Sequence, residues 1–221
     1  MDYRKLNEVT RKDKYLSPLI KETFRRVHRA KVFTKLDIRQ AFHRIQIDEA
    51  SEELTAFRTR YGSYQYKVMP FGLYNGPATF QRFINEVLFD ILDDFCTAYA
   101  DDILIYSDDP SQHEGHVKEV LARLRAAGLQ ADIKKSQFSV TETKFLGFIV
   151  STTGLRMDPE KVKTVVNWET PTNVKGVRSF LGFINFFRKF LKDHGRIRKP
   201  LVRLTKKNMP FKFGQTELNT F

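Results

Sequence analysis

Two adjacent aspartates, Asp101 and Asp102, lie between two short runs of apolar and β-branched residues. A third aspartate, Asp37, directly follows residues 31–36, a run that is typical of a β-strand. Neighbouring carboxylates repel each other unless a cation neutralises them. Hard divalent ions such as Mg²⁺ bind through one or two carboxylates together with substrate phosphates, and a pair of such ions can stabilise an in-line phosphoryl displacement. These aspartates are therefore candidate metal ligands for phosphoryl chemistry.

Aspartate pairs are also frequent in surface turns, and we interpret Asp93-Asp94 and Asp108-Asp109 in that way. Asp101-Asp102 differs because apolar residues enclose it on both sides, at 99–100 and 103–105. A solvated turn is less expected there, but the pattern alone leaves a metal site and an ordinary turn both open.

The elements that would position these aspartates are mixed strands and helices in the first two thirds of the chain. Residues 96–100 and 103–106 are typical of two strands joined by a tight hairpin at Asp101-Asp102. The other expected elements are a helix that begins near Pro77, a helix from Pro110 to a C-terminal cap at Gly128, and a buried strand over residues 144–150. This mixture predicts an α+β fold.

From residue 151 the pattern becomes helical and basic. Residues 151–221 carry +10 of the chain's formal net charge of +12. Asp158-Pro159 and Asn173 are expected to begin two helices. The second helix would have an apolar face and an outer face with Lys175, Arg178, Gly182 and Lys189. A concentrated basic excess suggests a polyanionic partner such as nucleic acid, although a solvated basic surface is the alternative.

Several residues limit the other classes of function. A single cysteine, Cys96, excludes an internal disulfide and a zinc site built from cysteines, and we expect it to be buried in a strand. No run of about 18 apolar residues is present, so we expect no membrane span and an intracellular protein. His113 and His116 could suggest a metal site, but we expect both to be exposed.

Five segments of the chain follow one another in a specific order: Phe33–Phe42 around Asp37, Met69–Gln81, Tyr99-Ala100-Asp101-Asp102, Gly128–Lys135 and Phe145–Phe148. In this order they resemble the motifs of reverse transcriptases. The similarity extends through almost the whole chain. The residues within the motifs most resemble those of the gypsy-type LTR retrotransposons, whose Pol polyprotein carries this segment. Five motifs in one order are far more specific than any one of them.

The resemblance implies a right-hand polymerase fold. Residues 1–150 would be partial fingers and the palm, with the Tyr-x-Asp-Asp hairpin in the palm sheet, and residues 151–210 would be a small, basic, helical thumb. Residues 211–221 would begin the connection toward ribonuclease H and be cut off before the nuclease. The part of the fingers that holds the triphosphate in this family would be truncated before Met1.

The resemblance also implies an RNA-directed and DNA-directed DNA polymerase. A primer 3′-hydroxyl would attack the α-phosphate of a deoxynucleoside triphosphate, and pyrophosphate would leave. Asp37, Asp101 and Asp102 would form the catalytic triad and the metal site for a pair of Mg²⁺ ions, which Mn²⁺ can replace, with Asp37 and Asp101 as the direct ligands. Lys135 falls where related polymerases keep a lysine that protonates pyrophosphate, and one of many surface lysines is the alternative.

The nucleotide-binding residues implied by the resemblance are Ala41, Phe42, Phe71, Gly72 and Gln81. Phe42 would lie under the sugar and select deoxynucleotides, because its ring would clash with a ribose 2′-hydroxyl; core packing is the alternative. Gln81 would support the loop of Phe71 and Gly72, where glycine allows the backbone to approach the base pair.

The implied template-primer residues are Arg4, Leu146, Gly147, Phe148, Arg178, Gly182 and Phe186. Arg4 would contact the template, residues 146–148 would be the primer grip, and the other three would track the minor groove. The implied partners are an RNA template, a DNA primer, the RNA–DNA hybrid and deoxynucleoside triphosphates, with ribonuclease H and integrase domains in the full-length protein. Its place would be a cytoplasmic virus-like particle or the nucleus.

A rival hypothesis from another class is a catalytically inactive, truncated remnant that only binds nucleic acid. The intact aspartate trio favours an enzyme, whereas the expected truncation of the fingers favours the remnant.

Overall fold

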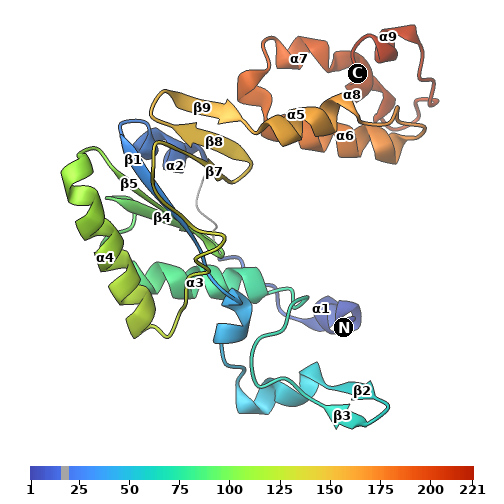
Figure 1. The fold of residues 1–221 in the computed structure, drawn as a ribbon. Helices are drawn as coiled ribbons and strands as arrows, with labels where there is room; N and C mark the ends of the chain where they lie inside the picture. Colours follow the sequence, from blue (N-terminus) through green and yellow to red (C-terminus); the bar gives the residue numbers. More distant parts are fainter. Residues whose placement is uncertain (16–19) are drawn as a thin grey trace. The chain divides into compact units, whose positions relative to one another are not determined.

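A four-stranded antiparallel sheet carries the aspartates in the computed structural model, which describes residues 1–15 and 20–221 (Figure 1). The strands lie in the order β4 (Cys96–Tyr99), β5 (Asp102–Ser107), β1 (Val32–Asp37) and β6 (Gln137–Val140). The chain divides into two compact units, Met1–Leu155 and Arg156–Phe221, and the sheet belongs to the first. This mixture of strands and helices confirms the predicted α+β class.

Alternation along the strands divides the sheet residues between two faces. One face packs against α3 (Gly76–Val87) and α4 (Pro110–Ala126). Its fully buried core residues include Leu36, Ile103, Ile105 and Cys96 from the sheet and Phe80, Ile84 and Val120 from the helices. Cys96 is thus a buried strand residue, as predicted.

The opposite face of the sheet carries Asp37 and Asp102 at one end. Away from these aspartates, it packs against α2 (Ile20–Val27) and against the hairpin of β7 (Glu142–Phe145) and β8 (Phe148–Ser151). The buried residues of this second core are Val27, Ala30, Phe33, Leu104, Tyr106, Phe145 and Val150. The hydrophobic contacts on both faces fix the sheet that positions the carboxylates.

Two expectations for the strands differ from the structure. The β4–β5 turn consists of Ala100 and Asp101, because Tyr99 pairs with Asp102, so Asp102 is a strand residue rather than a turn residue. Residues 144–150 do not form one strand either. They divide between β7 and β8, because Leu146 and Gly147 take the left-handed backbone conformation, with φ of 51° and 78°, and reverse the chain.

The remaining elements of the first unit are short. They are α1 (Arg4–Val9), the 3₁₀ helices η1 (Ala41–Arg44) and η2 (Glu49–Thr55), and the hairpin of β2 (Phe57–Thr59) and β3 (Gly62–Tyr64). Strand β9 (Gly154–Met157) extends the β7–β8 hairpin into a small sheet.

Helix α4 has the predicted ends. The Asp109 carboxylate accepts a hydrogen bond from the Ser111 N–H at 2.9 Å, and Gly128 follows the helix with φ of 71°.

The second unit is built from helices, but it begins at Arg156, and β9 occupies the start of the region that was expected to be helical from residue 151. The helices are α5 (Pro159–Val166), α6 (Val174–Phe186), η3 (Arg188–Phe190), α7 (His194–Ile197), α8 (Lys199–Leu204) and α9 (Gln215–Leu218). Asp158 and Asn173 cap α5 and α6 through their side chains. Phe211, Phe213 and Phe221 pack on the core of α6 and α8, so the last residues of the chain belong to this helical unit. Among the described residues, no helix is long and apolar enough to cross a membrane.

Candidate active site

The structure brings the three predicted aspartates to one end of the sheet. Asp37 ends β1 and lies directly opposite Asp102, the first residue of β5. Opposite residues of antiparallel strands project from the same face, so the two carboxylates are neighbours. The exposed fractions of their side chains are 18% for Asp37 and 27% for Asp102. Asp101 is exposed in the adjoining turn, and its carbonyl accepts a hydrogen bond at 2.9 Å from the N–H of Ile38, which follows Asp37.

Two lysines neutralise these carboxylates. The Nζ atom of Lys35 lies 2.9 Å from Oδ1 of Asp102, and the Nζ atom of Lys135 lies 3.5 Å from Oδ1 of Asp37. Lys135 is the lysine that the resemblance implied at the site, whereas Lys35 was not predicted there. The signal for Lys35 was its position two residues before Asp37 on a strand, because alternate strand residues share a face.

Electrostatics at Asp102 favour a nearby cation. Burial raises the pKa of this carboxyl, and the negative charges of Asp101 and Asp37 also raise it. The hydrogen bond and the positive charge of Lys35 act in the opposite direction. Because Asp101 and Asp37 both repel the charge on Asp102, binding of a divalent cation at this end of the sheet would relieve that repulsion.

The donor set of the site fits Mg²⁺ through its chemistry. Among residues 1–15 and 20–221, no three His, Cys, Asp or Glu side chains are gathered closely enough to hold a metal ion by themselves. Mg²⁺ does not need such a cage, because it takes one or two carboxylate oxygens and completes its octahedron with water and substrate phosphate oxygens. Asp37, Asp101 and Asp102 supply hard oxygen atoms of that kind.

Gln81 supports the aspartate turn rather than the loop of Phe71 and Gly72. The side chain is 3% exposed, and its Oε1 accepts a hydrogen bond from the Ala100 N–H at 2.8 Å. Its Nε2 donates to the Ala98 carbonyl at 3.1 Å. The expectation that Gln81 supports the nucleotide loop is therefore corrected, because the side chain points from α3 into the core beneath the β4–β5 turn.

Two of the other predicted nucleotide residues, Phe42 of η1 and Phe71, form an aromatic surface beside η1. The ring of half-buried Phe42 contacts the rings of Phe71 and Phe80, with centroid distances of 5.2 Å and 5.9 Å. Phe71 is 62% exposed, so one side of this cluster is open to a ligand. Ala41 is buried, and Gly72 has φ of 98°, a conformation that favours glycine.

The predicted primer-grip residues differ in exposure. Leu146 and Gly147 form the β7–β8 turn and are half-buried, whereas Phe148 is 4% exposed and packs edge-on against Phe24 at 5.0 Å. Phe148 therefore supports the turn from within the core. Arg4 begins α1, and its guanidinium pairs with Asp2 at 2.5 Å on the surface.

Within the second unit, Arg178, Gly182 and Phe186 lie four residues apart on α6 and are all exposed. The Nη2 atom of Arg178 donates a hydrogen bond to the Thr205 carbonyl at 3.2 Å, and this bond fixes the guanidinium at the surface. No atom lies within 4 Å of where a Cβ of Gly182 would be, so the helix is open there.

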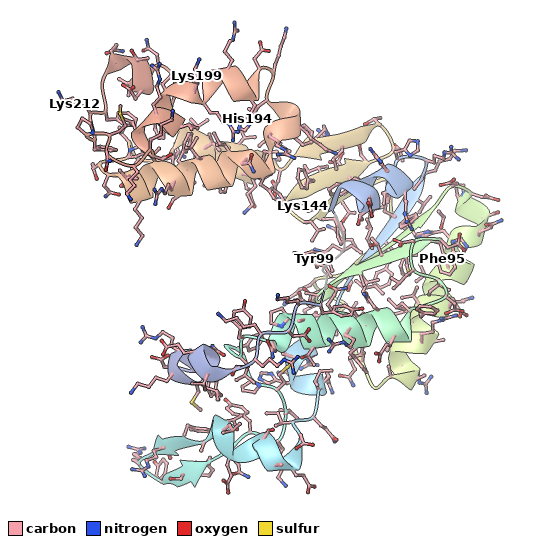
Figure 2. The ribbon with its side chains drawn as sticks, turned by 180° about the vertical axis from the view of Figure 1, so that it is seen from behind. Phe95, Tyr99, Lys144, His194, Lys199 and Lys212 are labelled. Carbon is pink, nitrogen blue, oxygen red and sulfur yellow. The ribbon has the colours of Figure 1, made fainter. Side chains whose placement is uncertain are left out.

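Lys199 and Lys212 add exposed basic side chains to the same unit (Figure 2). Lys189, expected on the same helix, lies beyond its end in η3.

The expectation that both histidines are exposed is wrong. His113 is 2% exposed, and its ring hydrogen-bonds to Oγ1 of Thr34 at 2.8 Å and to Oγ of Ser107 at 2.7 Å. His116 is half-buried, hydrogen-bonds to the same Ser107 hydroxyl at 2.8 Å and stacks on Phe95. Both rings face the sheet because α4 covers it, which helical spacing alone did not reveal.

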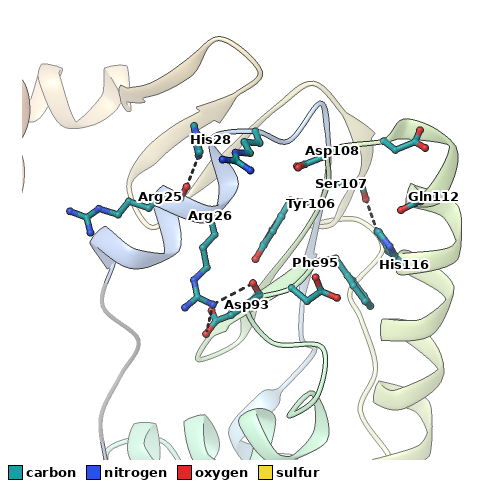
Figure 3. Close-up of a pocket in the computed structure, with 13 residues that line it drawn as sticks. Arg25, Arg26, His28, Asp93, Phe95, Tyr106, Ser107, Asp108, Gln112 and His116 are labelled. Carbon is teal, nitrogen blue, oxygen red and sulfur yellow. Dashed lines mark hydrogen bonds and ion pairs between the residues drawn. The ribbon is translucent and has the colours of Figure 1, made fainter.

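A pocket of about 520 Å³ lies at the end of β5 away from Asp102 (Figure 3). The Tyr106 hydroxyl is buried there without a hydrogen-bond partner among the described residues, and Arg26 pairs with Asp93 at 2.7 Å on the rim. Three arginines and four aspartates line the pocket, so its charge favours neither an anion nor a cation. None of the predicted site residues lines it.

Comparison with known proteins places this geometry in a family. Residues 1–150 match the family model described as reverse transcriptase (RNA-dependent DNA polymerase). The chain is 40% identical over 206 residues, 93% of its length, to the retrovirus-related Pol polyprotein from transposon opus of Drosophila melanogaster. It is 36% identical over its whole length to the Pol polyprotein from transposon gypsy of the same organism. The chain spans only 20% and 22% of the lengths of these two polyproteins.

Solved structures of the foamy viral protease-reverse transcriptase are similar in fold. The structure in complex with double-stranded DNA has a TM-score of 0.88, and the structure with an RNA/DNA hybrid has a TM-score of 0.83. Both are 27% identical to this chain and cover 99% of it, and the chain covers 39% and 30% of theirs. With the paired aspartates at the end of the sheet, these matches show that the chain belongs to the reverse transcriptase family and corresponds to the reverse transcriptase domain of a gypsy-type retrotransposon Pol polyprotein.

Proposed function

We propose that this chain copies RNA and DNA templates into DNA by adding deoxynucleotides to a primer 3′-hydroxyl. The observation that carries the proposal is the placement of Asp37 opposite Asp102, with Asp101 in the adjoining turn. In each step the primer oxygen forms a bond to the α-phosphorus, the bond from that phosphorus to the bridging oxygen breaks, and pyrophosphate leaves. The hydroxyl proton passes to solvent or to a basic group as the bond forms.

Asp37 and Asp101 would be the direct ligands of a pair of Mg²⁺ ions, and Asp102 the third carboxylate of the triad. The ions would supply positive charge to the attacking and leaving oxygens of the displacement. Lys135 would neutralise the departing pyrophosphate and give it a proton from Nζ. Its exposed side chain already reaches this end of the sheet, 3.5 Å from Oδ1 of Asp37.

Recognition of the deoxynucleotide would fall to the aromatic surface beside η1. Phe42 would lie under the sugar and exclude a 2′-hydroxyl, and the exposed Phe71 with Gly72 would face the base pair. Gln81 would act indirectly, by holding the turn that carries Asp101.

The partners would be an RNA template, a DNA primer and their hybrid or duplex, as in the foamy viral complexes with RNA/DNA hybrid and with double-stranded DNA. In this proposal residues 1–150 contain the palm with part of the fingers. The second unit would be a thumb that contacts the backbone through Arg178, Gly182 and Phe186, while Leu146 and Gly147 grip the primer and Arg4 contacts the template. The polyprotein would add ribonuclease H and integrase domains and would work in a virus-like particle.

Primer extension tests the proposal. A labelled DNA primer annealed to an RNA template is incubated with the 221-residue chain, Mg²⁺ and deoxynucleoside triphosphates, and lengthening of the primer is the expected result. Tight binding of the hybrid without any extension, in Mg²⁺ or Mn²⁺, would instead support the inactive remnant that only binds nucleic acid.

A further inference from the structure

Lys35 makes the shortest ion pair at the candidate active site. It lies two residues before Asp37 on β1, so the two side chains share a face of the sheet. Its direct partner on β5 is Leu104, and Asp102 is the diagonal neighbour, within reach of a long side chain. The distance from Nζ to Oδ1 is 2.9 Å, and the exposed fractions are 20% for Lys35 and 27% for Asp102. Water therefore screens this pair less than it screens a pair at the surface.

The three carboxylates are partnered unequally. Asp102 is held by this sheltered ammonium, whereas Asp37 has only the 66% exposed Lys135 at 3.5 Å. Asp101 is exposed, and within the described part of the chain its carboxylate makes no ion pair. Asp37 and Asp101 can therefore turn toward a cation at little cost, whereas Asp102 would have to leave a sheltered partner.

We propose that Lys35 is a positioning residue that holds Asp102 outside the inner shell of the metal ions, so that Asp37 and Asp101 alone bind them. This inference rests on the proposed function, and it adds Lys35 to the residues that take part in nucleotide addition. Lys35 also cancels one negative charge among the three carboxylates. It thereby limits how tightly a divalent ion binds before the substrate phosphates arrive.

A cycle of variants measured by Mn²⁺ binding tests this role without nucleic acid. Free Mn²⁺ is quantified by electron paramagnetic resonance for the wild type, Lys35→Met, Asp102→Asn and the double variant. Lys35→Met should bind Mn²⁺ about fivefold more tightly, because a repelling cation is lost and Asp102 is released. Asp102→Asn should bind about fivefold more weakly, because Lys35 is left uncompensated. The double variant should return to within about twofold of the wild type.

The double variant decides the question. If Asp102 is itself an inner ligand, the double variant loses that bond and remains about tenfold or more weaker than the wild type, which would overturn the proposal. Lys31→Met is the matched control, because it removes one lysine charge directly before the same strand, where the Lys31 N–H donates a hydrogen bond to the Ser107 carbonyl. Lys31→Met should bind Mn²⁺ as the wild type does.

Primer-extension kinetics supply a second readout. Lys35→Met should lower kcat about tenfold while leaving KM for the deoxynucleotide unchanged, because the carboxylates are misplaced but the aromatic surface is intact. Lys35→Arg should recover most of kcat. A kcat for Lys35→Met equal to that of Lys31→Met would contradict the proposal. If the wild type extends no primer, the proposed function fails, and the Mn²⁺ cycle still tests the role of Lys35.

Discussion

The side-chain oxygen of Gln81 accepts a hydrogen bond at 2.8 Å from the backbone N–H of Ala100, the residue directly before Asp101. Ala100 has φ of 50°, a left-handed conformation that costs a non-glycine residue about 1–2 kcal/mol. A buried side chain on α3 thus stabilises the backbone conformation that presents the aspartate. The position of Asp101 therefore depends on the packing of α3 against the sheet.

Replacing Gln81 with leucine should destabilise the fold and impair catalysis together. The Ala100 N–H and the Ala98 carbonyl would lose their side-chain partners, so the free energy of unfolding in urea should fall by about 1–3 kcal/mol. Primer extension should slow because the turn loosens. Glu86→Leu, at an exposed position of the same helix, is the control, and equal stability of the two variants would contradict the role of Gln81.

Phe42→Ala should weaken the discrimination against ribonucleotides by about tenfold or more, because the ring that would exclude a 2′-hydroxyl is removed. The measurement is the ratio of single-turnover incorporation efficiencies for a deoxynucleotide and the matching ribonucleotide. A ratio is insensitive to a general loss of active protein. Phe57→Ala, a half-buried aromatic on β2, should keep the ratio of the wild type. An unchanged ratio in Phe42→Ala would show that this ring only packs against Phe71 and Phe80.

Duplex binding by the chain should depend steeply on salt and little on sequence. Each phosphate contact releases counterions and contributes about −0.9 to the slope of the logarithm of the binding constant against the logarithm of the salt concentration. Four or five contacts therefore give a slope of about −4. Arg178→Ala should flatten this slope by about one and weaken binding to all sequences alike. The check is a salt titration by fluorescence anisotropy. Lys118→Ala is the control, because it removes one charge from α4, which covers the sheet face opposite the one that carries Asp37 and Asp102. An unaltered slope in Arg178→Ala would mean that this face of α6 is only solvated.

The buried His113 should make stability depend on pH. Burial lowers the pKa of this histidine below its ordinary value of 6.5, and the charge of His116 adds to the shift. As the pH falls below about 6.5, His113 therefore binds a proton in the unfolded chain before it does so in the folded protein. The free energy of unfolding should decrease from that pH downward. Urea unfolding at pH 7.5 and pH 5.5 measures this loss. His113→Gln should show a smaller loss, and an equal loss in both proteins would remove His113 as its cause.

The strand patterns in the sequence placed each aspartate on an element but did not bring the three together. They put Asp37 at the end of one strand and Asp101-Asp102 between two others, and only the resemblance implied a common site. The register of Asp37 with Asp102 brings these two aspartates to one end of the sheet. The turn lies one residue earlier than predicted, because Ala100 takes the left-handed conformation and neither Asp101 nor Asp102 does. Leu146 likewise has a positive φ, and it interrupts a run of residues whose pattern predicts one strand.

Long-range partners were beyond the local pattern. Lys35, Gln81 and His113 each act on residues that are distant in the sequence or on another element, so their roles depend on tertiary packing. Composition placed the basic excess in the second unit correctly, but it could not show that Phe211 and Phe221 complete the core of that unit.

The rate of primer extension by Asp101→Asn, compared with that by Asp108→Asn, is the sharpest test of the proposed active site. Asp108 is an exposed aspartate that directly follows the other end of β5, and it serves as the matched control. With an RNA template and Mg²⁺, Asp101→Asn should extend the primer about a thousandfold or more slowly than the wild type while binding the hybrid nearly as tightly. Asp108→Asn should extend it at the rate of the wild type. An Asp101→Asn protein that polymerises at a rate close to that of Asp108→Asn would contradict the assignment of the active site.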